Sequence, residues 1–161
     1  DKMSGKMAAR KERLVLPVAD ADFSASAVAL SRIALRAKNA RGSGDVFSQE
    51  GVQIRPSPSR EFRASDNLII FFEMYNAAPG AETGKPLVRV TVTLTKDDKA
   101  VTRPIDYMLT EALTEPVPHM TFAKYISLAR LSPGKYVAVI EALDVVTRKL
   151  VRRQAPFVIT Q

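Results

Sequence analysis

Residues 87–95 (LVRVTVTLT) alternate strictly between apolar and polar side chains. In an extended chain, Val88, Val90, Val92 and Leu94 fall on one side, and an arginine and three threonines fall on the other. A helix would not separate these residues so cleanly, because its period is 3.6 residues rather than two. The segment therefore predicts a β-strand in a sheet that has one buried face.

Further strand-like segments follow one another from residue 52 onward. Residues 68–75 (LIIFFEMY) are apolar on both faces, as in a central strand. About seven short strands at intervals of roughly 10–15 residues, with no long helix between them, are typical of an immunoglobulin-like fold. The predicted fold class is thus all-β, an immunoglobulin-like antiparallel β-sandwich that an N-terminal extended segment precedes. The expected strands are 52–56, 68–75, 87–95, 100–105, 121–130, 136–143 and 150–159.

The first third of the chain has a different character, and we divide the sequence into 1–51, an N-terminal tail or linker, and 52–161, the sandwich domain. Residues 13–18 (RLVLPV) are typical of a short extended segment, and Pro17 indicates an edge or an end. Residues 27–37 (AVALSRIALRA) leave helix and extended chain both open, since alanine and leucine favour a helix but the apolar stripe is incomplete.

The net charge of +7 is concentrated near the start of the chain. Residues 1–60 hold 11 Lys/Arg and 6 Asp/Glu, a net of +5, whereas residues 61–161 hold 13 and 11, a net of +2. A nucleic-acid-binding domain usually carries its charge on the folded surface. The distribution favours a solvated basic tail over a phosphate-binding surface.

The residues that most chemistry requires are scarce. The chain has no cysteine, which excludes disulfides and thiolate metal sites, and its one histidine, His119, lies in a proline-rich loop. Glu73 and Glu141 could form a carboxylate pair for glycoside hydrolysis, but surface positions on strands explain them more simply. Asp97 and Asp98 could hold calcium weakly, but adjacent aspartates also favour a tight turn. We therefore predict no catalytic, cofactor-binding or metal-binding residues.

The stretch LSPGKY predicts a tyrosine corner, formed by Leu131, Pro133, Gly134 and Tyr136. In such a corner the tyrosine hydroxyl bonds to a nearby backbone group and closes a Greek-key connection. The alternative is a plain hairpin in which the tyrosine only packs.

A second candidate feature is a partner-binding patch. Phe71 and Phe72 point to opposite faces of their strand, so one of them could lie outside the core. If that sheet is not covered on both sides, Phe72 or Tyr75 could mark an exposed apolar patch.

Several stretches together resemble the C-terminal part of the bacterial von Willebrand factor A-related domain proteins. They cover most of residues 13–160 and comprise LSRIAL (30–35) after RLVLPV, IRPSPSREF (54–62), IFFEMYN (70–76), LARLSPGKY (128–136), ALD (142–144) and Phe157-Val158. The resemblance implies that the chain is the tail of a larger exported protein, that residues 30–35 are extended, and that residues 13–18 are the last strand of a preceding domain. It also implies a periplasmic or secreted location. The Asp-x-Ser-x-Ser metal motif of the A domain itself is absent, so no ligand residues carry over.

The leading hypothesis is a non-catalytic structural or interaction module that spaces or docks neighbouring domains of the same parent protein or another protein. The alternative is a sandwich that binds a carbohydrate or a protein ligand, and the third is nucleic-acid binding through the basic N-terminal segment. No apolar run is long enough to span a membrane. A free N-terminal strand could pair with a second molecule and form a homodimer.

Overall fold

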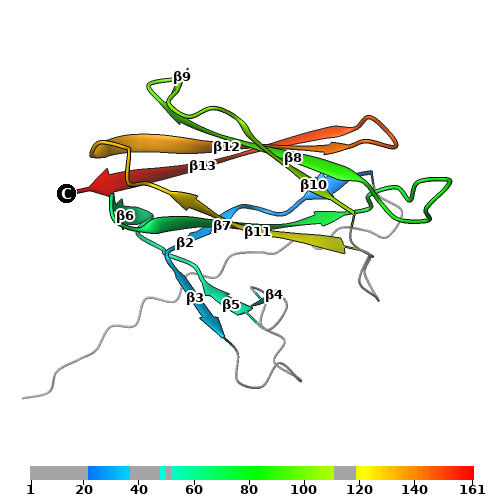
Figure 1. Ribbon diagram of the computed structural model, residues 1–161, viewed down its shortest axis with the longest axis horizontal. Helices are drawn as coiled ribbons and strands as arrows, with labels where there is room; N and C mark the ends of the chain where they lie inside the picture. Colours follow the sequence, from blue (N-terminus) through cyan, green and yellow to red (C-terminus); the bar gives the residue numbers. More distant parts are fainter. Residues whose placement is uncertain (1–21, 37–47, 50–51, 111–118) are drawn as a thin grey trace, which may run out of the picture.

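A computed structural model of the chain describes residues 22–36, 48–49, 52–110 and 119–161. Within these ranges no residue is helical, and the strands form two large sheets packed face to face with a small third sheet beside them (Figure 1). The prediction of an all-β, immunoglobulin-like sandwich is confirmed. We name each sheet after its central strand: the β7 sheet, the β12 sheet and the β5 sheet.

The β7 sheet has β7 (Asn67–Tyr75) in its centre. Strand β11 (His119–Ser127) pairs with one edge of β7, and two short strands, β1 (Ser24–Ala25) and β2 (Ala29–Ser31), pair with the other. All three pairings are antiparallel. The apolar run predicted at 68–75 is therefore a central strand.

The β12 sheet has the strand order β10-β8-β12-β13-β6, and β9 pairs with the end of β8. Its pairings are antiparallel except that of β6 with β13, which is parallel. The expected strand at 100–105 is replaced by two, because the chain turns after β9 and the longer strand begins only at Ile105. The bounds are β6 (Glu61–Arg63), β8 (Val88–Lys96), β9 (Lys99–Ala100), β10 (Ile105–Leu109), β12 (Gly134–Asp144) and β13 (Leu150–Thr160).

The chain crosses repeatedly between the two large sheets. It passes from β7 to β8 and β10 in the other sheet, returns to β11, and crosses again to β12 and β13. These crossings give the Greek-key connectivity of immunoglobulin-like sandwiches. They also bring the β12 and β13 strands, which are late in the sequence, beside β8 and β6.

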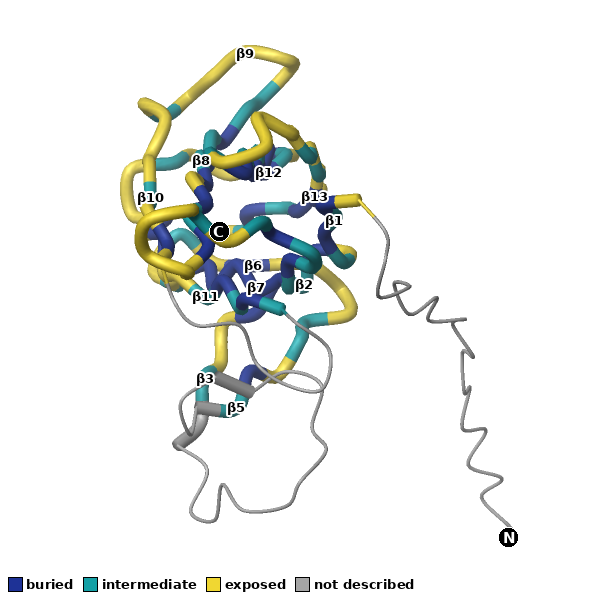
Figure 2. Tube along the Cα trace, turned by 90° about the vertical axis from the view of Figure 1, so that its right-hand side faces the viewer, coloured by how far each residue is buried: buried dark blue, intermediate teal, exposed yellow. Residues whose placement is uncertain are grey.

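The core fills the space between the two large sheets. Strand alternation directs Val88, Val90, Val92 and Leu94 inward, as the sequence predicts, and all four are buried. Aromatic rings pack at the centre, where the Phe72 and Phe122 centroids lie 5.0 Å apart. Each large apolar side chain buried in this way contributes about 1.5–3 kcal/mol to folding. Figure 2 shows this buried interior between the two layers.

The sandwich begins before residue 52, where the sequence placed the domain boundary. Strands β1 and β2 lie in the expected tail, yet they pair with β7 and direct Phe23, Ala25, Val28 and Leu30 into the core. The sequence pattern did not reveal β1 and β2, because small polar residues interrupt their apolar residues. Both strands also pair with residues of β7 that are about 40–50 positions away in the sequence. The extended interpretation of residues 30–35 is confirmed by β2 and β3. Residues 13–18 lie outside the described residues.

The β5 sheet is a small insertion between β2 and β6. It consists of β3 (Ile33–Arg36), β4 (Ser48–Gln49) and β5 (Val52–Arg55), so the strand expected at 52–56 is not part of the sandwich. The buried hydroxyl of Ser31 connects β3 and β5 where they leave the sandwich. It donates to the carbonyl oxygens of Ile33 and Arg55 and accepts a hydrogen bond from the Ile33 amide. Ile54 packs on Ile69 and Phe71, so the insertion covers part of the outer face of the β7 sheet.

Candidate interaction surface

The outer face of the β12 sheet is the broadest sheet surface that the described residues leave uncovered. In Figure 1 the β5 sheet lies beneath the β7 sheet, whereas no other described sheet lies against the β12 sheet from outside. The side chains opposite the core form this outer face. They are Arg89, Thr91, Thr93 and Thr95 on β8, Lys135, Val137, Val139, Glu141 and Leu143 on β12, and Leu150, Arg152, Gln154, Pro156 and Val158 on β13.

Strand register divides this face into two regions. The half nearer the β12–β13 turn mixes polar pairs with an exposed leucine: Thr91 donates to the Asp106 carboxylate at 2.6 Å, Arg152 lies 3.9 Å from Glu141, and Leu150 is exposed beside the turn. Toward the other end, Thr95, Val137 and Pro156 are direct neighbours across three strands. The second region is therefore a strip of small, mostly apolar side chains.

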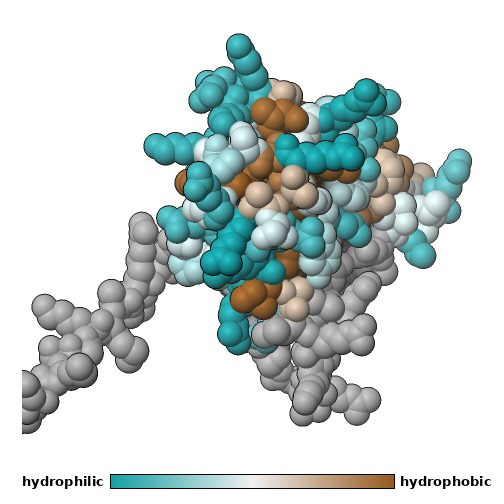
Figure 3. Space-filling model, turned by 60° about the vertical axis from the view of Figure 1, so that its left-hand side comes forward, coloured by the Kyte–Doolittle hydropathy of each residue, from teal (hydrophilic) through white to brown (hydrophobic). Residues whose placement is uncertain are grey.

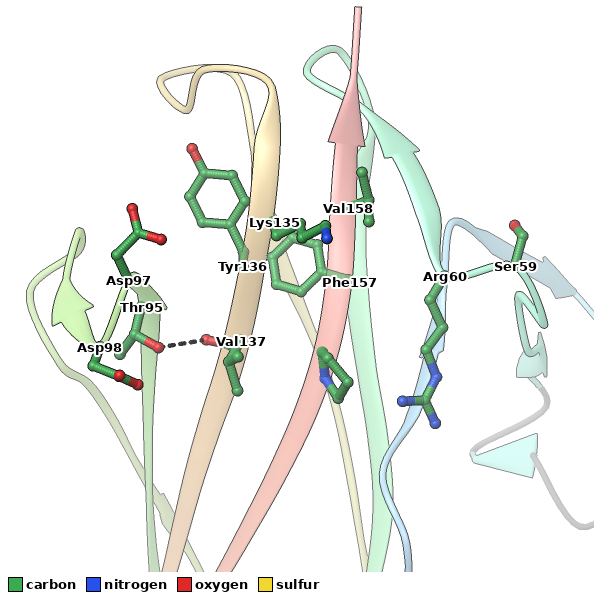
Figure 4. Close-up of a pocket in the computed structure, with 11 residues that line it drawn as sticks. Ser59, Arg60, Thr95, Asp97, Asp98, Lys135, Tyr136, Val137, Phe157 and Val158 are labelled. Carbon is green, nitrogen blue, oxygen red and sulfur yellow. Dashed lines mark hydrogen bonds between the residues drawn. The ribbon is translucent and has the colours of Figure 1, made fainter.

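A groove of about 450 Å³ opens at the apolar end of this face (Figure 4). Its floor includes Thr95, Val137, Pro156 and Val158, and the rings of Tyr136 and Phe157 lie at its base. Both rings are buried, so the groove offers little exposed aromatic surface. Figure 3 brings this end of the molecule forward and shows small apolar areas between projecting hydrophilic side chains.

Charged side chains border the groove on its two sides. Asp97 and Asp98 lie at the β8–β9 turn, and Arg60 lies just before β6, beyond β13 (Figure 4). The Lys135 amine is directed away from the two aspartates, toward Val158. Among the described residues, none of these four charged side chains has an ion-pair or hydrogen-bond partner, and all four are exposed. Among the charged residues that line the groove, carboxylates therefore lie at one side and a guanidinium at the other, and Lys96, which directly precedes the two aspartates, has its amine 5.3 Å from the centroid of the Tyr136 ring.

The two aspartates also form the turn that the sequence favoured. Lys96 and Lys99 pair across a two-residue loop, and Asp97 and Asp98 have φ values of 50° and 61°. Two successive positive φ angles are the signature of a type I′ hairpin turn, which asparagine and aspartate tolerate. No group of three or more His, Cys, Asp or Glu side chains that could hold a metal occurs among the described residues.

The tyrosine-corner residues lie in the crossing from β11 to β12, between the two large sheets. The Tyr136 hydroxyl donates to the Ser132 carbonyl oxygen at 2.7 Å, which is the bond that the corner requires. Gly134 has a φ of 151°, which residues with a side chain rarely adopt, so the backbone favours glycine at this position. The carbonyl of Pro133 accepts a hydrogen bond from the Lys96 amine, and Leu131 packs against the core.

Of the two residues expected to mark a partner patch, Phe72 or Tyr75, Phe72 lies in the core. Phe72 is 1% exposed because it faces the other sheet, and Phe71 is 2% exposed because Ile54 of the β5 sheet packs on it. The sequence could not reveal this cover, since it comes from an insertion outside the strand pattern. Tyr75 is half-buried, and its hydroxyl donates to Glu73. Burial, followed by the hydrogen bond and the negative charge of Glu73, raises the pKa of Tyr75 well above its ordinary value.

The two glutamates considered for catalysis lie on opposite outer faces. Glu73 is on the outer face of the β7 sheet and Glu141 on that of the β12 sheet, with the whole core between them. Stacked sheets are about 10 Å apart at the backbone, and the two side chains point away from each other. A glycosidase pair needs carboxyl groups about 5–9.5 Å apart on either side of one bond. These two residues cannot form such a pair.

The one histidine of the sequence, His119, lies beside the Tyr75 ring, with a distance of 6.1 Å between the ring centroids.

Sequence reasoning missed two residues that hold the sandwich together. Asp144 is fully buried, and its carboxylate accepts hydrogen bonds from the amides of Ala78, Val146 and Thr147 and from the Thr147 hydroxyl. Arg153 reaches from β13 to the carbonyl oxygens of Ala25 and Ser26, and so joins β1 to the opposite sheet. The groove was also missed, although Asp97, Asp98 and Tyr136 were considered for other roles, because its lining residues come together only when four strands align.

Comparison with known proteins adds no family to this geometry. No protein-family model matches the sequence, and no curated protein matches it significantly. Among solved structures, a β-glucosidase from Listeria innocua in complex with glucose superposes with a TM-score of 0.44 at 9% identity, over 87% of this chain. The β-glucosidase EmGH1 from Erythrobacter marinus gives 0.40 at 12% identity, over 86%. The chain spans only 16% and 15% of these two structures, and likenesses this weak say nothing of activity.

The described residues also contain no helix long and apolar enough to cross a membrane.

Proposed function

We propose that this chain is a non-catalytic structural or interaction module of a larger exported bacterial protein. The outer face of the β12 sheet docks a neighbouring domain of the same parent protein or another protein. The periplasmic or secreted setting rests on the resemblance to the von Willebrand factor A-related proteins. The observation that carries the docking role is the difference between the two outer faces. The insertion covers part of the outer face of the β7 sheet, whereas no element among the described residues lies over the strip of Thr95, Val137 and Pro156 on the β12 sheet.

Such a strip is suited to association. Small apolar and hydroxyl-bearing side chains lose little conformational entropy when a partner covers them. The paired charges at the other end of the face, Glu141 with Arg152, remain solvated and can form the polar rim of an interface. The described residues also bring no nucleophile, base and orienting group together, and Glu73 is bonded to a tyrosine rather than poised beside a second carboxylate.

The docking role is tested by a photo-crosslinking amino acid at Thr93, in the middle of the face, in bacteria that produce the chain. The matched control carries the same amino acid at Thr83, an exposed position in the β7–β8 loop. We expect one defined product from Thr93, which Val137→Arg removes, and none from Thr83. No product from Thr93, or equal products from both positions, would refute the docking role.

The non-catalytic part of the proposal has its own test. The purified chain is assayed against a panel of aryl glycosides and ester substrates. We expect no turnover above buffer. Hydrolysis that Glu73→Gln abolishes would show that the chain is an enzyme.

The alternative, a sandwich that binds a carbohydrate or a protein ligand, loses Phe71 and Phe72 as contact residues because both are buried, and Tyr125 is the most exposed aromatic side chain among the described residues. Nucleic-acid binding through the basic N-terminal segment, residues 1–41, of which 1–21 and 37–41 lie outside the described residues, stays a hypothesis. So does a homodimer through the N-terminal strand, although residues 24–25 and 29–31 are already paired with β7 of the same chain.

A further inference from the structure

We infer that the groove at the apolar end of the β12 sheet binds an extended peptide segment with a basic residue at one end and an acidic residue at the other. This inference rests on the proposed docking role of the β12 face, and it adds the chemistry of the ligand. It is carried by the floor of the groove and by the charges at its two sides.

The charges select a ligand of mixed sign. Asp97 and Asp98 border one side and Arg60 borders the other, while Lys135 lies on β12 between them with its amine directed away from the aspartates. All four side chains are exposed, and among the described residues none has a partner that neutralises it. A ligand with one charge sign would be attracted at one side and repelled at the other. A basic group near the aspartates and an acidic group near the arginine would satisfy both sides.

The strand geometry sets the distance between those two groups. The groove runs across the strands in the order β8, β12, β13 and β6, which is three inter-strand intervals. Neighbouring strands lie about 4.8 Å apart, so the two sides are separated by about 14 Å. An extended peptide advances about 3.3 Å per residue. The two charged residues of the ligand should therefore be four positions apart.

The floor favours a peptide over a sugar. Sugars bind to sandwich surfaces through exposed aromatic rings, but Tyr136 and Phe157 are 3% and 2% exposed. What the floor offers instead is a shallow apolar surface from Val137, Pro156 and Val158. Short aliphatic side chains of an extended peptide fit such a surface.

The inference is tested by titrating the ¹⁵N-labelled chain with three acetylated, amidated peptides and following backbone amide shifts. Because side chains alternate along an extended peptide, an aliphatic residue midway between the charged ends faces the floor with them. The mixed peptide is therefore Lys-Thr-Val-Thr-Glu, and the controls are Lys-Thr-Val-Thr-Lys and Glu-Thr-Val-Thr-Glu. We expect the mixed peptide to bind roughly twofold to fivefold more tightly than either control, as one additional exposed ion pair provides. The shifts should centre on Thr95, Val137 and Val158.

Variants that keep the backbone test the role of each side. Asp97→Asn with Asp98→Asn retains residues that tolerate positive φ, and should make the doubly acidic peptide bind at least as well as the mixed one. Arg60→Asn suits the φ of 54° for the same reason, and together with Lys135→Gln it should favour the doubly basic peptide.

Equal binding of all three peptides, or an absence of shifts in the groove, would overturn the inference. A crosslink from Thr93 with no peptide effect would refute the peptide ligand alone and leave the docking role intact. If the crosslinking amino acid at Thr93 gives no product but the mixed peptide still binds in the groove, the docking role alone is refuted.

Discussion

Replacement of Asp144 by alanine tests whether a buried carboxylate joins the two turns at one end of the sandwich. The side chain is 0% exposed and accepts four hydrogen bonds. Three come from Val146 and Thr147 in the β12–β13 turn, and the fourth comes from the Ala78 amide, 66 residues away in sequence, at 3.0 Å. Alanine removes the acceptor of all four.

The magnitude follows from how many donors water can reach after the substitution. Val146 and Thr147 are exposed, so part of their bonding can be recovered from solvent. We therefore count two donors as left without an acceptor: the amide of Ala78, which is half-buried, and one of the three donors in the β12–β13 turn. Each costs about 1–3 kcal/mol, so Asp144→Ala should lower the free energy of unfolding by about 2–6 kcal/mol.

Urea denaturation at neutral pH measures this loss, with the m-value as a check that the two-state transition is preserved. Asp144→Asn should cost less, because its amide oxygen can still accept the Val146 and Thr147 amides. The control is Asp106→Asn, an exposed aspartate bonded to Thr91, whose effect should stay within about 0.5 kcal/mol. A loss below about 1 kcal/mol for Asp144→Ala, with an unchanged m-value, would refute the role assigned to this carboxylate.

Three further perturbations probe other contacts. Tyr136→Phe removes the bond to Ser132 and keeps the ring, and it should cost about 0.5–1.5 kcal/mol in urea denaturation. The pKa of Tyr75 is raised in the folded state, so the unfolded state loses this proton first as the pH rises. The free energy of unfolding should therefore be fully retained below the ordinary tyrosine pKa near 10 and fall above it. Glu73→Gln should reduce this alkaline loss, as measured by thermal melts. Ile54→Ala should speed amide hydrogen exchange in residues 33–36 and 52–55 while leaving β12 and β13 protected.

Each of these has a matched control or a contrary result. Tyr125→Phe changes an exposed tyrosine, so its effect should be near zero, and a Tyr136→Phe variant equally stable would exclude a stabilising corner bond. An alkaline loss that Glu73→Gln leaves unchanged would mean that the glutamate does not influence Tyr75. Uniformly faster exchange after Ile54→Ala would mean that the β5 sheet and the sandwich unfold as one unit.

The sequence by itself determined the features that depend on near neighbours along the chain. The alternation at 87–95 predicts a strand with one buried face, and the structure buries its four apolar residues. The LSPGKY stretch predicts a hydroxyl-to-backbone bond, and its donor and acceptor are only four residues apart. Short-range patterns of this kind survive in the fold because the backbone period fixes them.

Only the tertiary structure determined which elements cover each face of a strand. Phe71 and Phe72 are adjacent residues of one apolar run, and the sequence does not distinguish their surroundings. In the fold, the opposite sheet buries Phe72, and the β5 sheet buries Phe71 through Ile54. The groove likewise draws residues from 59 to 158, which become neighbours only when β8, β12, β13 and β6 align. Contacts between residues so far apart depend on strand order and crossings, and no local period in the chain encodes these.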